Sequence, residues 1–336
     1  MFYGFDFTNN ICYIATYDGK KVEESDLVVC PQGLDERVAF LKGYVANDDR
    51  AAVAIEEVDE SIQEFSAKLG PAFKVLSKEE AFGYYILGED NTMWKRQNGA
   101  FEFHKDYFRF YEMSREGRIL AVSSKRCDMK EVSLTTDKEK DKFFTKQSAD
   151  VLNVRQINNV FLNGEEFKTD WMKLSLNALC AGRRVFAGNH LFATGALRSL
   201  TSNHNHRLEL MTEDYHPFVW GIRTYHHGKK DVFAPIIQSG NFWFLTKGYV
   251  DVFVDECEEL IIEGRNSLNQ EKITLKLPLA FKSANPMRTT KLRIEIVCTG
   301  IHTILIRISD MGFGKTRAGA GKIFEEEYKL PSITGR

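Results

Sequence analysis

The sequence lacks the features that mark several common protein classes. Its six cysteines lie far apart and include no Cys-x-x-Cys pair, which excludes a disulfide-rich scaffold and a zinc ribbon. Neither sign of charge dominates, because 45 lysine and arginine residues face 47 aspartate and glutamate residues, for a net charge of −2. A basic surface for a polyanion is therefore not expected. We predict reduced thiols and no nucleic acid partner.

Long apolar runs are also missing. No stretch reaches the roughly 18 apolar residues that would span a bilayer, and the first residues include no basic segment that leads into an apolar stretch, as a secretion signal would. A hydrophobic share of 43% and a charged share of 27% are typical of soluble globular proteins. We therefore expect a folded cytoplasmic protein with no membrane partner. Its 336 residues are enough for about two domains.

Residues 1–95 have the pattern of a three-stranded meander followed by alternating helices and strands. Apolar and polar residues alternate on both sides of turns predicted at Asn9-Asn10 and Asp18-Gly19. Periodicity predicts the later elements, which are helices at 34–45 and 60–69, strands at 51–55 and 73–76, and a third helix after Ser77. Ser77 and Glu80 have the spacing of a capping box. The predicted order is βββαβαβα.

Residues 96–205 repeat this order. The predicted elements are strands at 101–103, 107–113, 159–162 and 183–187, and helices at 169–179 and 191–200. Asp6 and Glu102 are 96 residues apart, whereas Gly83 and Gly195 are 112 residues apart, a drift that loop insertions in a second copy would produce. A chance match between two α/β segments is the alternative. We predict a duplicated α/β fold with lobes at 1–95 and 96–205.

The last third of the chain has a different pattern. Residues 201–217 are polar and rich in histidine, which predicts a linker or surface loop. Apolar and polar residues then alternate in seven segments, which are 218–225, 231–237, 243–255, 258–262, 272–279, 290–298 and 302–310. Many short strands separated by turns indicate an antiparallel sandwich or barrel. We predict an antiparallel β-sandwich domain at 218–330.

Five sequence motifs carry a resemblance to a known superfamily. They are YGFDFTNNICYIA, FEFHKDYFRFY, NNVFLNGEEFKTDWM and NHLFATGALRSL in the first two thirds, and RIEIVCTGIHTILIRISDMGFGK near the end. The first four resemble the duplicated ribonuclease-H-like ATPase fold shared by actin, sugar kinases and DnaK-type chaperones. The last resembles the β-sandwich substrate-binding region of DnaK-type chaperones. As a whole, the sequence looks like an uncharacterised bacterial family with this two-lobed architecture.

The resemblance assigns roles to particular residues. It implies that Asp6 and Glu102 hold Mg²⁺ and are catalytic if the protein is active, that Thr8 and Asn9 contact phosphates, and that Gly164 and Gly195 contact the adenosine of ATP. The family hairpins are rich in glycine, whose backbone N–H groups approach phosphates closely. Here Phe7 stands in the first hairpin, and the second hairpin has no glycine. We expect the Phe7 ring to fill the phosphate space.

Two functions follow from this reading, and the sequence leaves the question of enzymatic activity open. In the first, the nucleotide site is degenerate, no cofactor is certain, and the chain is a chaperone-like protein-binding or scaffold module that binds a protein through residues 218–330. In the alternative, it is an active Mg-ATP-dependent ATPase or kinase. The aromatic residues that begin the last domain fit either peptide capture at a sheet edge or core packing; they are Phe242, Trp243, Phe244, Tyr249 and Phe253.

Two further stretches resemble ligand sites. Gly314-Lys315-Thr316 ends like a phosphate-binding loop, but Ser309 stands where that loop needs its first glycine, so we interpret the stretch as a basic turn. Five histidines lie close together in sequence, at 204, 206, 216, 226 and 227. Imidazoles on a loop can bind zinc or nickel, but no catalytic metal motif accompanies them. We interpret them as surface residues of the linker.

Overall fold

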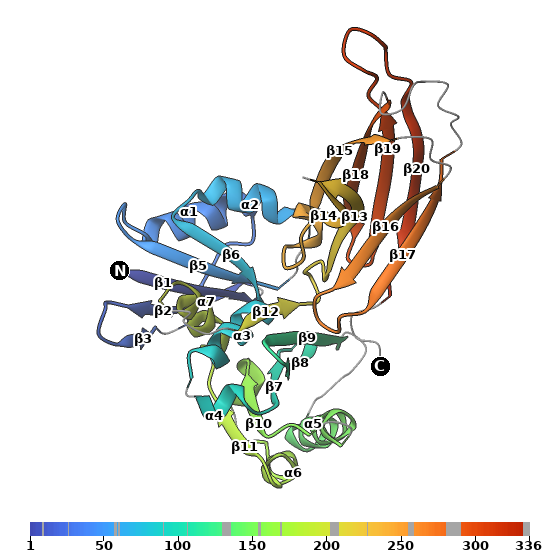
Figure 1. Cartoon of the computed structure of the whole chain (residues 1–336). Coiled ribbons are helices and arrows are strands. Elements are labelled where there is room, and N and C mark those ends of the chain that lie inside the picture. The colour runs from blue at the N-terminus through green and yellow to red at the C-terminus, as the bar shows by residue number, and fades with distance from the viewer. Residues whose placement is uncertain are drawn as a thin grey trace. The chain divides into compact units, whose positions relative to one another are not determined.

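In the computed structural model the chain forms two compact units, Met1–Thr212 and Glu213–Arg336 (Figure 1). It describes residues 1–331 except positions 9, 26, 57–58, 60, 90, 106, 130–135, 154–155, 169, 202–207, 227, 255–258 and 280–289. Within the described residues, no helix is long and apolar enough to cross a membrane. The expected finer division of the first unit into lobes at 1–95 and 96–205 stays a prediction.

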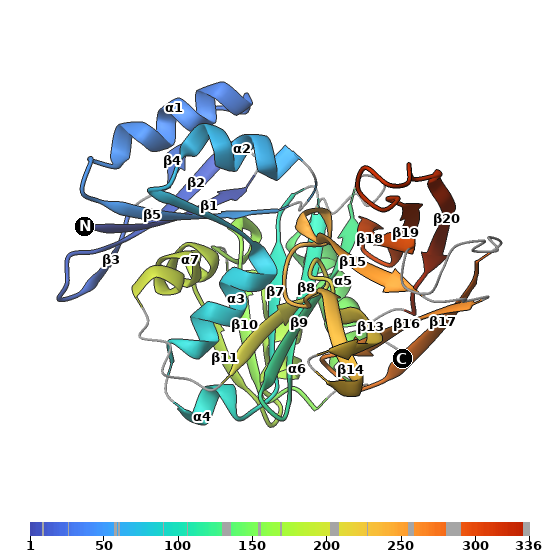
Figure 2. The same ribbon diagram turned by 45° about the horizontal axis from the view of Figure 1, so that its top comes forward.

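The first sheet of unit 1 combines a meander with two parallel strands. Its strands are β1 (Phe2–Thr8), β2 (Ile11–Tyr17), β3 (Val22–Glu24), β4 (Val28–Val29), β5 (Arg50–Ile55) and β6 (Phe73–Ser77). Their order is β3-β2-β1-β5-β6, with β4 also paired to β2. Strands β1 and β2 are antiparallel, whereas β5 lies parallel to β1 and β6 parallel to β5. Helices α1 (Leu34–Tyr44) and α2 (Ser61–Leu69) pack on one face, as Figure 2 shows.

The second sheet repeats this strand order. Its strands are β7 (Asn98–Phe103), β8 (Tyr107–Glu116), β9 (Ile119–Asp128), β10 (Asn159–Asn163), β11 (Arg184–Ala187) and β12 (Glu209–Thr212). The order β11-β10-β7-β8-β9-β12 matches the first sheet strand for strand up to β9. Helices α5 (Asp137–Leu152) and α6 (Leu174–Cys180) and the short 3₁₀ helix Glu165–Lys168 complete the half. The expected repeat of βββαβαβα is confirmed.

One expectation about this half is wrong. Residues 209–212, expected as part of a linker, form strand β12, which pairs in parallel with β9. A strand of four residues is too short to show alternation, and its partner lies far away in sequence. The local pattern therefore gave no signal for it.

Two helices join the sheets. Helix α3 (Lys78–Leu87) and helix α7 (Leu191–Thr201) pack against each other between the two sheets, and the short helix α4 (Asn91–Trp94) follows α3 (Figure 2). One hydrophobic core contains residues of both sheets and both helices, among them Ala52 of β5, Phe82 of α3, Ala100 of β7 and Phe192 of α7. The shared core means that the two halves of unit 1 are packed against each other through these helices.

Unit 2 consists of two four-stranded antiparallel sheets with a common core. The strands are β13 (Phe218–His226), β14 (Lys229–Ile237), β15 (Lys247–Val254), β16 (Glu259–Asn266), β17 (Lys272–Pro278), β18 (Thr290–Gly300), β19 (Thr303–Asp310) and β20 (Gly321–Lys329), with a 3₁₀ turn at Trp243–Leu245. The sheet orders are β14-β13-β16-β17 and β15-β18-β19-β20. Buried side chains of both sheets, such as Trp220, Ile262, Ile294 and Ile306, form one cluster.

The last strand of unit 2 was not predicted. The alternation ends at Asp310, and three consecutive glutamates, residues 325–327, obscure the apolar face of β20 at the sheet edge. The stretch that contains Gly314-Lys315-Thr316 connects β19 to β20, which confirms its interpretation as a turn. It is fixed by Asp310, whose carboxylate accepts hydrogen bonds from Arg317 at 2.6 and 2.7 Å.

Candidate functional site

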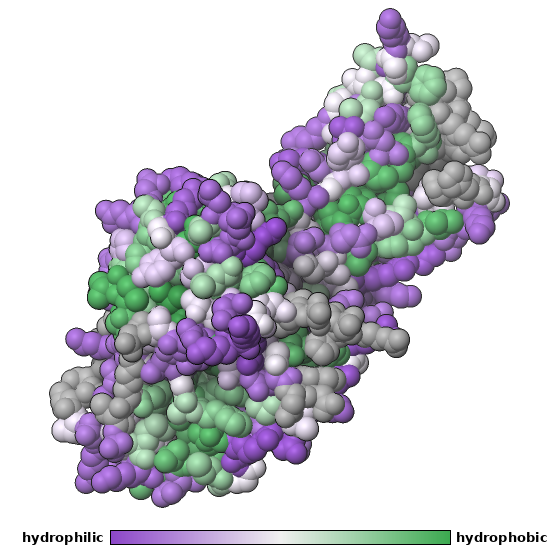
Figure 3. All heavy atoms as spheres, turned by 90° about the vertical axis from the view of Figure 1, so that its left-hand side faces the viewer, coloured by the Kyte–Doolittle hydropathy of each residue, from purple (hydrophilic) through white to green (hydrophobic). Residues whose placement is uncertain are grey.

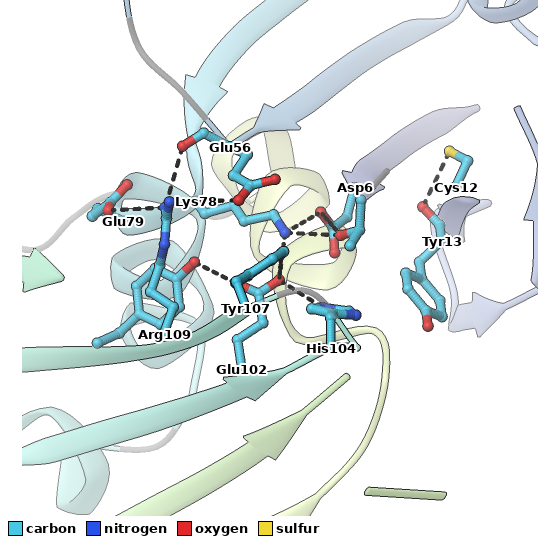
Figure 4. A network of polar contacts seen from close by, with 12 residues as sticks. Asp6, Cys12, Tyr13, Glu56, Lys78, Glu79, Glu102, His104, Tyr107 and Arg109 are labelled. Atoms are coloured by element: carbon cyan, nitrogen blue, oxygen red, sulfur yellow. Dashed lines mark hydrogen bonds and ion pairs between the residues drawn. The ribbon is translucent and has the colours of Figure 1, made fainter. Parts of the chain in front are cut away.

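Two of the predicted site residues, Asp6 and Thr8, lie on the face of β1 opposite to the core under α1 and α2. Successive side chains of a strand point to opposite faces, so Phe5 and Phe7 enter the core under α1 and α2. Asp6 points the other way, toward Lys78 (Figure 4), and Thr8 contacts the same lysine. The expectation that Phe7 would block the phosphate space is therefore wrong. Its ring packs against Phe40, on the face opposite Asp6.

A buried lysine lies between the two predicted metal ligands. The Nζ of Lys78 is 2.5 Å from Oε1 of Glu102, 2.8 Å from Oγ1 of Thr8 and 3.5 Å from Oδ1 of Asp6. The side chains of Asp6, Lys78 and Glu102 are 0% exposed. Asp6 and Glu102 are thus brought together as expected from the repeat. What they contact in this structure is an ammonium group.

Helix capping sets the position of Lys78. The hydroxyl of Ser77 accepts a hydrogen bond from the backbone N–H of Glu80, and the Glu80 carboxylate accepts one from the backbone N–H of Ser77. This capping box, expected from the sequence, fixes the start of α3 where β6 ends. Lys78 is therefore the first residue of the helix, and its side chain reaches across to β1 and β7.

Glu102 has several partners besides Lys78. The hydroxyl of Tyr111 donates to its Oε2 at 2.6 Å, and Tyr107 and the Nε2 of His104 lie 3.1 Å from its Oε1. Burial alone would raise the pKa of Glu102, but Lys78 and His104 hold it below its ordinary value. The carboxylate is therefore ionised and fully engaged in hydrogen bonds.

The carboxylate of Asp6 has fewer hydrogen-bond partners than that of Glu102. Its Oδ1 contacts Lys78 and the Thr8 hydroxyl, the latter at 3.5 Å, whereas its Oδ2 has no hydrogen-bond partner among the described residues. Burial raises the pKa of Asp6 to about 6, although Lys78 opposes the shift. Burial alone would lower the pKa of Lys78, but the carboxylates of Asp6 and Glu102 hold it well above its ordinary value. The lysine is therefore a permanent cation.

A second ionic network links the two sheets beside this cluster. Arg109 on β8 donates to the backbone carbonyl of Glu56 at 3.2 Å and lies 3.8 Å from Oε1 of Glu79 on α3. Arg126 on β9 forms an ion pair with Glu56, and the hydroxyl of Ser124 donates to Glu79 at 2.5 Å. Charged contacts therefore join the end of β5 and the start of α3 to β8 and β9, and Figure 4 shows those of Arg109 with Glu56 and Glu79.

A cavity of about 380 Å³ lies beside the Phe7 ring. Its lining includes Phe7, Leu34, Arg37, Glu56 and Phe65, and the Arg37 guanidinium lies 5.2 Å from the centre of the Phe7 ring. The cavity is bounded by α1, α2 and the ends of β1 and β5, so it does not include Asp6 or Thr8.

The remaining predicted site residues have other surroundings. Asn9 lies outside the described residues. Gly164 follows β10 with a positive φ of 118°, and a Cβ there would lie 2.3 Å from the carbonyl oxygen of Phe103. A Cβ at Gly195 would lie 1.9 Å from the carbonyl oxygen of Ala81, so this glycine lets α7 pack closely on α3. The expected adenosine contacts of both glycines stay predictions.

The expectation that the five histidines lie in a linker is wrong at two positions, because His226 is the last residue of strand β13 and His216 is buried. The side chain of His216 is 0% exposed and accepts a hydrogen bond from Trp220, so it belongs to the core of unit 2. Positions 204, 206 and 227 lie outside the described residues. Among the residues described, no group of three histidine, cysteine, aspartate or glutamate side chains is placed to hold a metal ion.

Sequence reasoning missed Lys78 and the groups around Glu102. A partial signal was present in FEFHKDYFRFY, where Glu102 near the end of β7 alternates with His104 just beyond it, and Tyr107, Arg109 and Tyr111 share one face of β8. Polar groups at alternate positions of an aromatic hairpin indicate a buried polar cluster. Nothing local to Lys78 distinguishes it from an exposed lysine at a helix start.

Two family models match the chain. Residues 53–211 match a model described as "Family of unknown function (DUF5716) C-terminal", and residues 216–330 match a "Domain of unknown function (DUF8552)". Comparison with curated protein sequences gives no match.

Solved structures similar to this chain include sugar kinases and a dehydratase activator. An inorganic polyphosphate/ATP-glucomannokinase from Arthrobacter sp. strain KM is 13% identical, with a TM-score of 0.43 over 60% of this chain and 99% of that chain. A ROK family glucokinase from Streptomyces griseus, in complex with glucose and AMPPNP, is 10% identical, with a TM-score of 0.40 over 58% and 97%. The activator of the 2-hydroxyisocaproyl-CoA dehydratase from Clostridium difficile, with bound ADPNP, is 10% identical, with a TM-score of 0.37 over 59% and 92%.

The class of unit 1 follows from its own topology. It is a mixed α/β fold in which two sheets repeat one strand order around a pair of central helices, and it resembles the actin-like ATPases as its motifs implied. Unit 2 adds two antiparallel sheets with a common core.

Proposed function

We propose that this chain is a diverged actin-like and DnaK-like protein whose nucleotide site is degenerate, and that it acts as a protein-binding scaffold in the cytoplasm. The observation that supports this proposal is the position of Lys78. Its ammonium contacts both carboxylates and the hydroxyl that the resemblance assigns to magnesium and phosphate.

These residues do not fit a divalent cation while Lys78 lies among them. Magnesium needs oxygen ligands at about 2.1 Å in an octahedral arrangement, and here the side-chain oxygens of Glu102 and Thr8 already accept hydrogen bonds from the ammonium. A second positive charge beside a buried ammonium would also be repelled strongly, because the interior screens charges poorly. While the Lys78 ammonium holds these oxygens, they are not available to coordinate magnesium.

Unit 2 supplies the surface for the proposed protein contact. On the face shown in Figure 3, apolar patches are interrupted by hydrophilic residues, so exposed apolar area alone does not identify an interface. Unit 2 has the most exposed aromatic rings among the described residues: Tyr249 and Phe253 on β15 are 60% and 57% exposed, and Tyr225 on β13 is 62% exposed, whereas Phe313 is 41% exposed. The rings of Phe253 and Phe313 lie 6.1 Å apart. Aromatic residues are enriched at protein interfaces.

A thermal shift experiment with ATP and magnesium tests the degenerate site. A ligand at about 100 times its dissociation constant stabilises a protein by about 2.7 kcal/mol, which is several degrees in melting temperature. We expect no shift of the wild-type chain at millimolar nucleotide. A shift that the variant Asp6→Ala abolishes would overturn the proposal and favour the active ATPase or kinase.

A capture experiment tests the protein contact. The full chain and its double variant Tyr249→Ala/Phe253→Ala are used as bait in extract of the native host, with Val29→Ala, which alters a 71% exposed residue of unit 1, as the matched control. We expect a partner that the wild type and the control retain and the double variant loses. Equal capture by all three proteins would contradict the assignment to unit 2.

A further inference from the structure

We infer that Lys78 is a resident cation that takes the position of a divalent metal between Asp6 and Glu102, and that removing its side chain opens this position to a metal ion. The inference deepens the proposed function and rests on it, since it gives the physical reason why the site is degenerate. It also predicts a concealed metal site, which is a property that loss of nucleotide binding alone would not produce.

The groups around the Lys78 ammonium are those that a hard cation prefers. They are two carboxylates and one hydroxyl, contributed by Asp6 and Thr8 on β1 and by Glu102 on β7. Magnesium and manganese take carboxylate oxygens, with water completing their coordination. The ammonium supplies one positive charge and three donors in their place. It therefore neutralises only part of the charge of two carboxylates, and Oδ2 of Asp6 is left without a hydrogen bond among the described residues.

The lysine also connects the two halves of unit 1. Its backbone is fixed by the capping box of α3, and its ammonium bridges the first strand of one sheet and the first strand of the other. Lysine cannot dissociate as a metal would, so this bridge between β1 and β7 is permanent. A site that holds its own cation needs no ligand to keep these strands together.

Removal of the Lys78 side chain should free the carboxylates for a metal ion. The variant Lys78→Ala would leave two carboxylates and the Thr8 hydroxyl around a space that the lysine chain and ammonium had filled. This space is polar and carries negative charge, so a hydrated divalent cation is the natural replacement. The variant Lys78→Met removes the charge but keeps the space filled by an apolar chain, so it should not accept the ion.

Manganese is a suitable probe, because it takes the ligands of magnesium and its free concentration is measured by electron paramagnetic resonance. We expect millimolar Mn²⁺ to raise the melting temperature of Lys78→Ala by about 5 °C or more. Wild type, Lys78→Met and the double variant Lys78→Ala/Glu102→Gln should show no such rise. The resonance signal should report one additional bound ion in Lys78→Ala, compared with wild type.

Two results would overturn the inference. One is a folded Lys78→Ala variant that neither binds nor is stabilised by Mn²⁺. The other is Mn²⁺ binding by the wild-type chain that Asp6→Asn abolishes, and this measurement applies even when Lys78→Ala does not fold. Because the experiment contains no nucleotide, its result is independent of the test of the proposed function. A rise in the melting temperature of wild type with ATP would reject the degenerate nucleotide site. A Lys78→Ala variant that does not respond to Mn²⁺ would reject only the concealed metal site.

Discussion

The indole Nε1–H of Trp220 donates a hydrogen bond to Nε2 of His216 at 3.0 Å, and both side chains are 0% exposed. The imidazole must be neutral at this nitrogen to accept the bond. Burial lowers the pKa of His216 from 6.5 to about 4. A histidine in the core of unit 2 is thus kept uncharged at neutral pH, and protonating it costs stability.

The first prediction concerns acid stability. Between pH 6.5 and pH 4 the unfolded chain binds a proton at His216 that the folded chain does not, so the contribution of this group to stability falls as the pH falls through this window. The pKa shift of His216 corresponds to about 3 kcal/mol. The variant His216→Gln keeps an acceptor for Trp220 and has no proton to take up. Urea unfolding at pH 4 and pH 7 should therefore show a smaller acid-induced loss for this variant than for wild type.

The variant Trp220→Phe is the control for this measurement. It removes the hydrogen-bond donor but leaves the buried imidazole, so this variant should still lose stability between pH 7 and pH 4. An equal loss for wild type and His216→Gln would show that other groups set the acid sensitivity of unit 2.

The second prediction concerns the crossing of the two central helices. A Cβ at Gly195 would lie 1.9 Å from a backbone oxygen of α3, which no side-chain rotation can relieve. Gly195→Ala should therefore lower the free energy of unfolding by about 3 kcal/mol. Gly43 on α1 is a matched control, because a Cβ there meets nothing within 4 Å and alanine is the better helix former by about 1 kcal/mol. Denaturant midpoints that move in the same direction for both variants would contradict this account.

The architecture of unit 1 could be predicted because its signals are local. Alternation gave the two meanders, and the spacing of Ser77 and Glu80 gave the start of α3. Strands β12 and β20 were missed because their pairing partners are remote and their own alternation is short or covered by glutamates. These segments form strands because they pair with strands that are distant in sequence, and a single sequence does not show this pairing.

The site was predicted only in part, for a similar reason. Equivalence of the two hairpins placed Asp6 opposite Glu102, and both contact Lys78. The identity of the group between them depends on the direction of one side chain at a helix start, and lysines at such positions are mostly exposed. The block expected from Phe7 was wrong because the side chains of a strand alternate, which places this ring on the face opposite Asp6.

The third prediction concerns Asp6. Burial raises its pKa from 3.8 to about 6, so between pH 4 and pH 6 the folded chain holds a proton that the unfolded chain has lost. Stability therefore falls as the pH rises through this window, by about 3 kcal/mol for this group. Asp6→Asn lacks this cost. Urea unfolding measures the free energy of unfolding of Asp6→Asn and wild type from pH 4 to pH 7. As the pH rises, the variant should become more stable relative to wild type. A difference that stays constant over this range would refute the assignment of the pKa shift to Asp6.

The fourth prediction separates the charge of Lys78 from its packing. Lys78→Met leaves Asp6 and Glu102 buried without their counterion, and breaking a buried ion pair in this way costs about 3–5 kcal/mol. The triple variant Asp6→Asn/Lys78→Met/Glu102→Gln has no buried charge left in the cluster, so it should recover most of that loss. Lys42→Met, at an exposed position of α1, controls for the loss of a lysine. Denaturant unfolding at pH 7 measures all of them, and a triple variant as unstable as Lys78→Met would contradict the assignment of that loss to the two carboxylates left without a counterion.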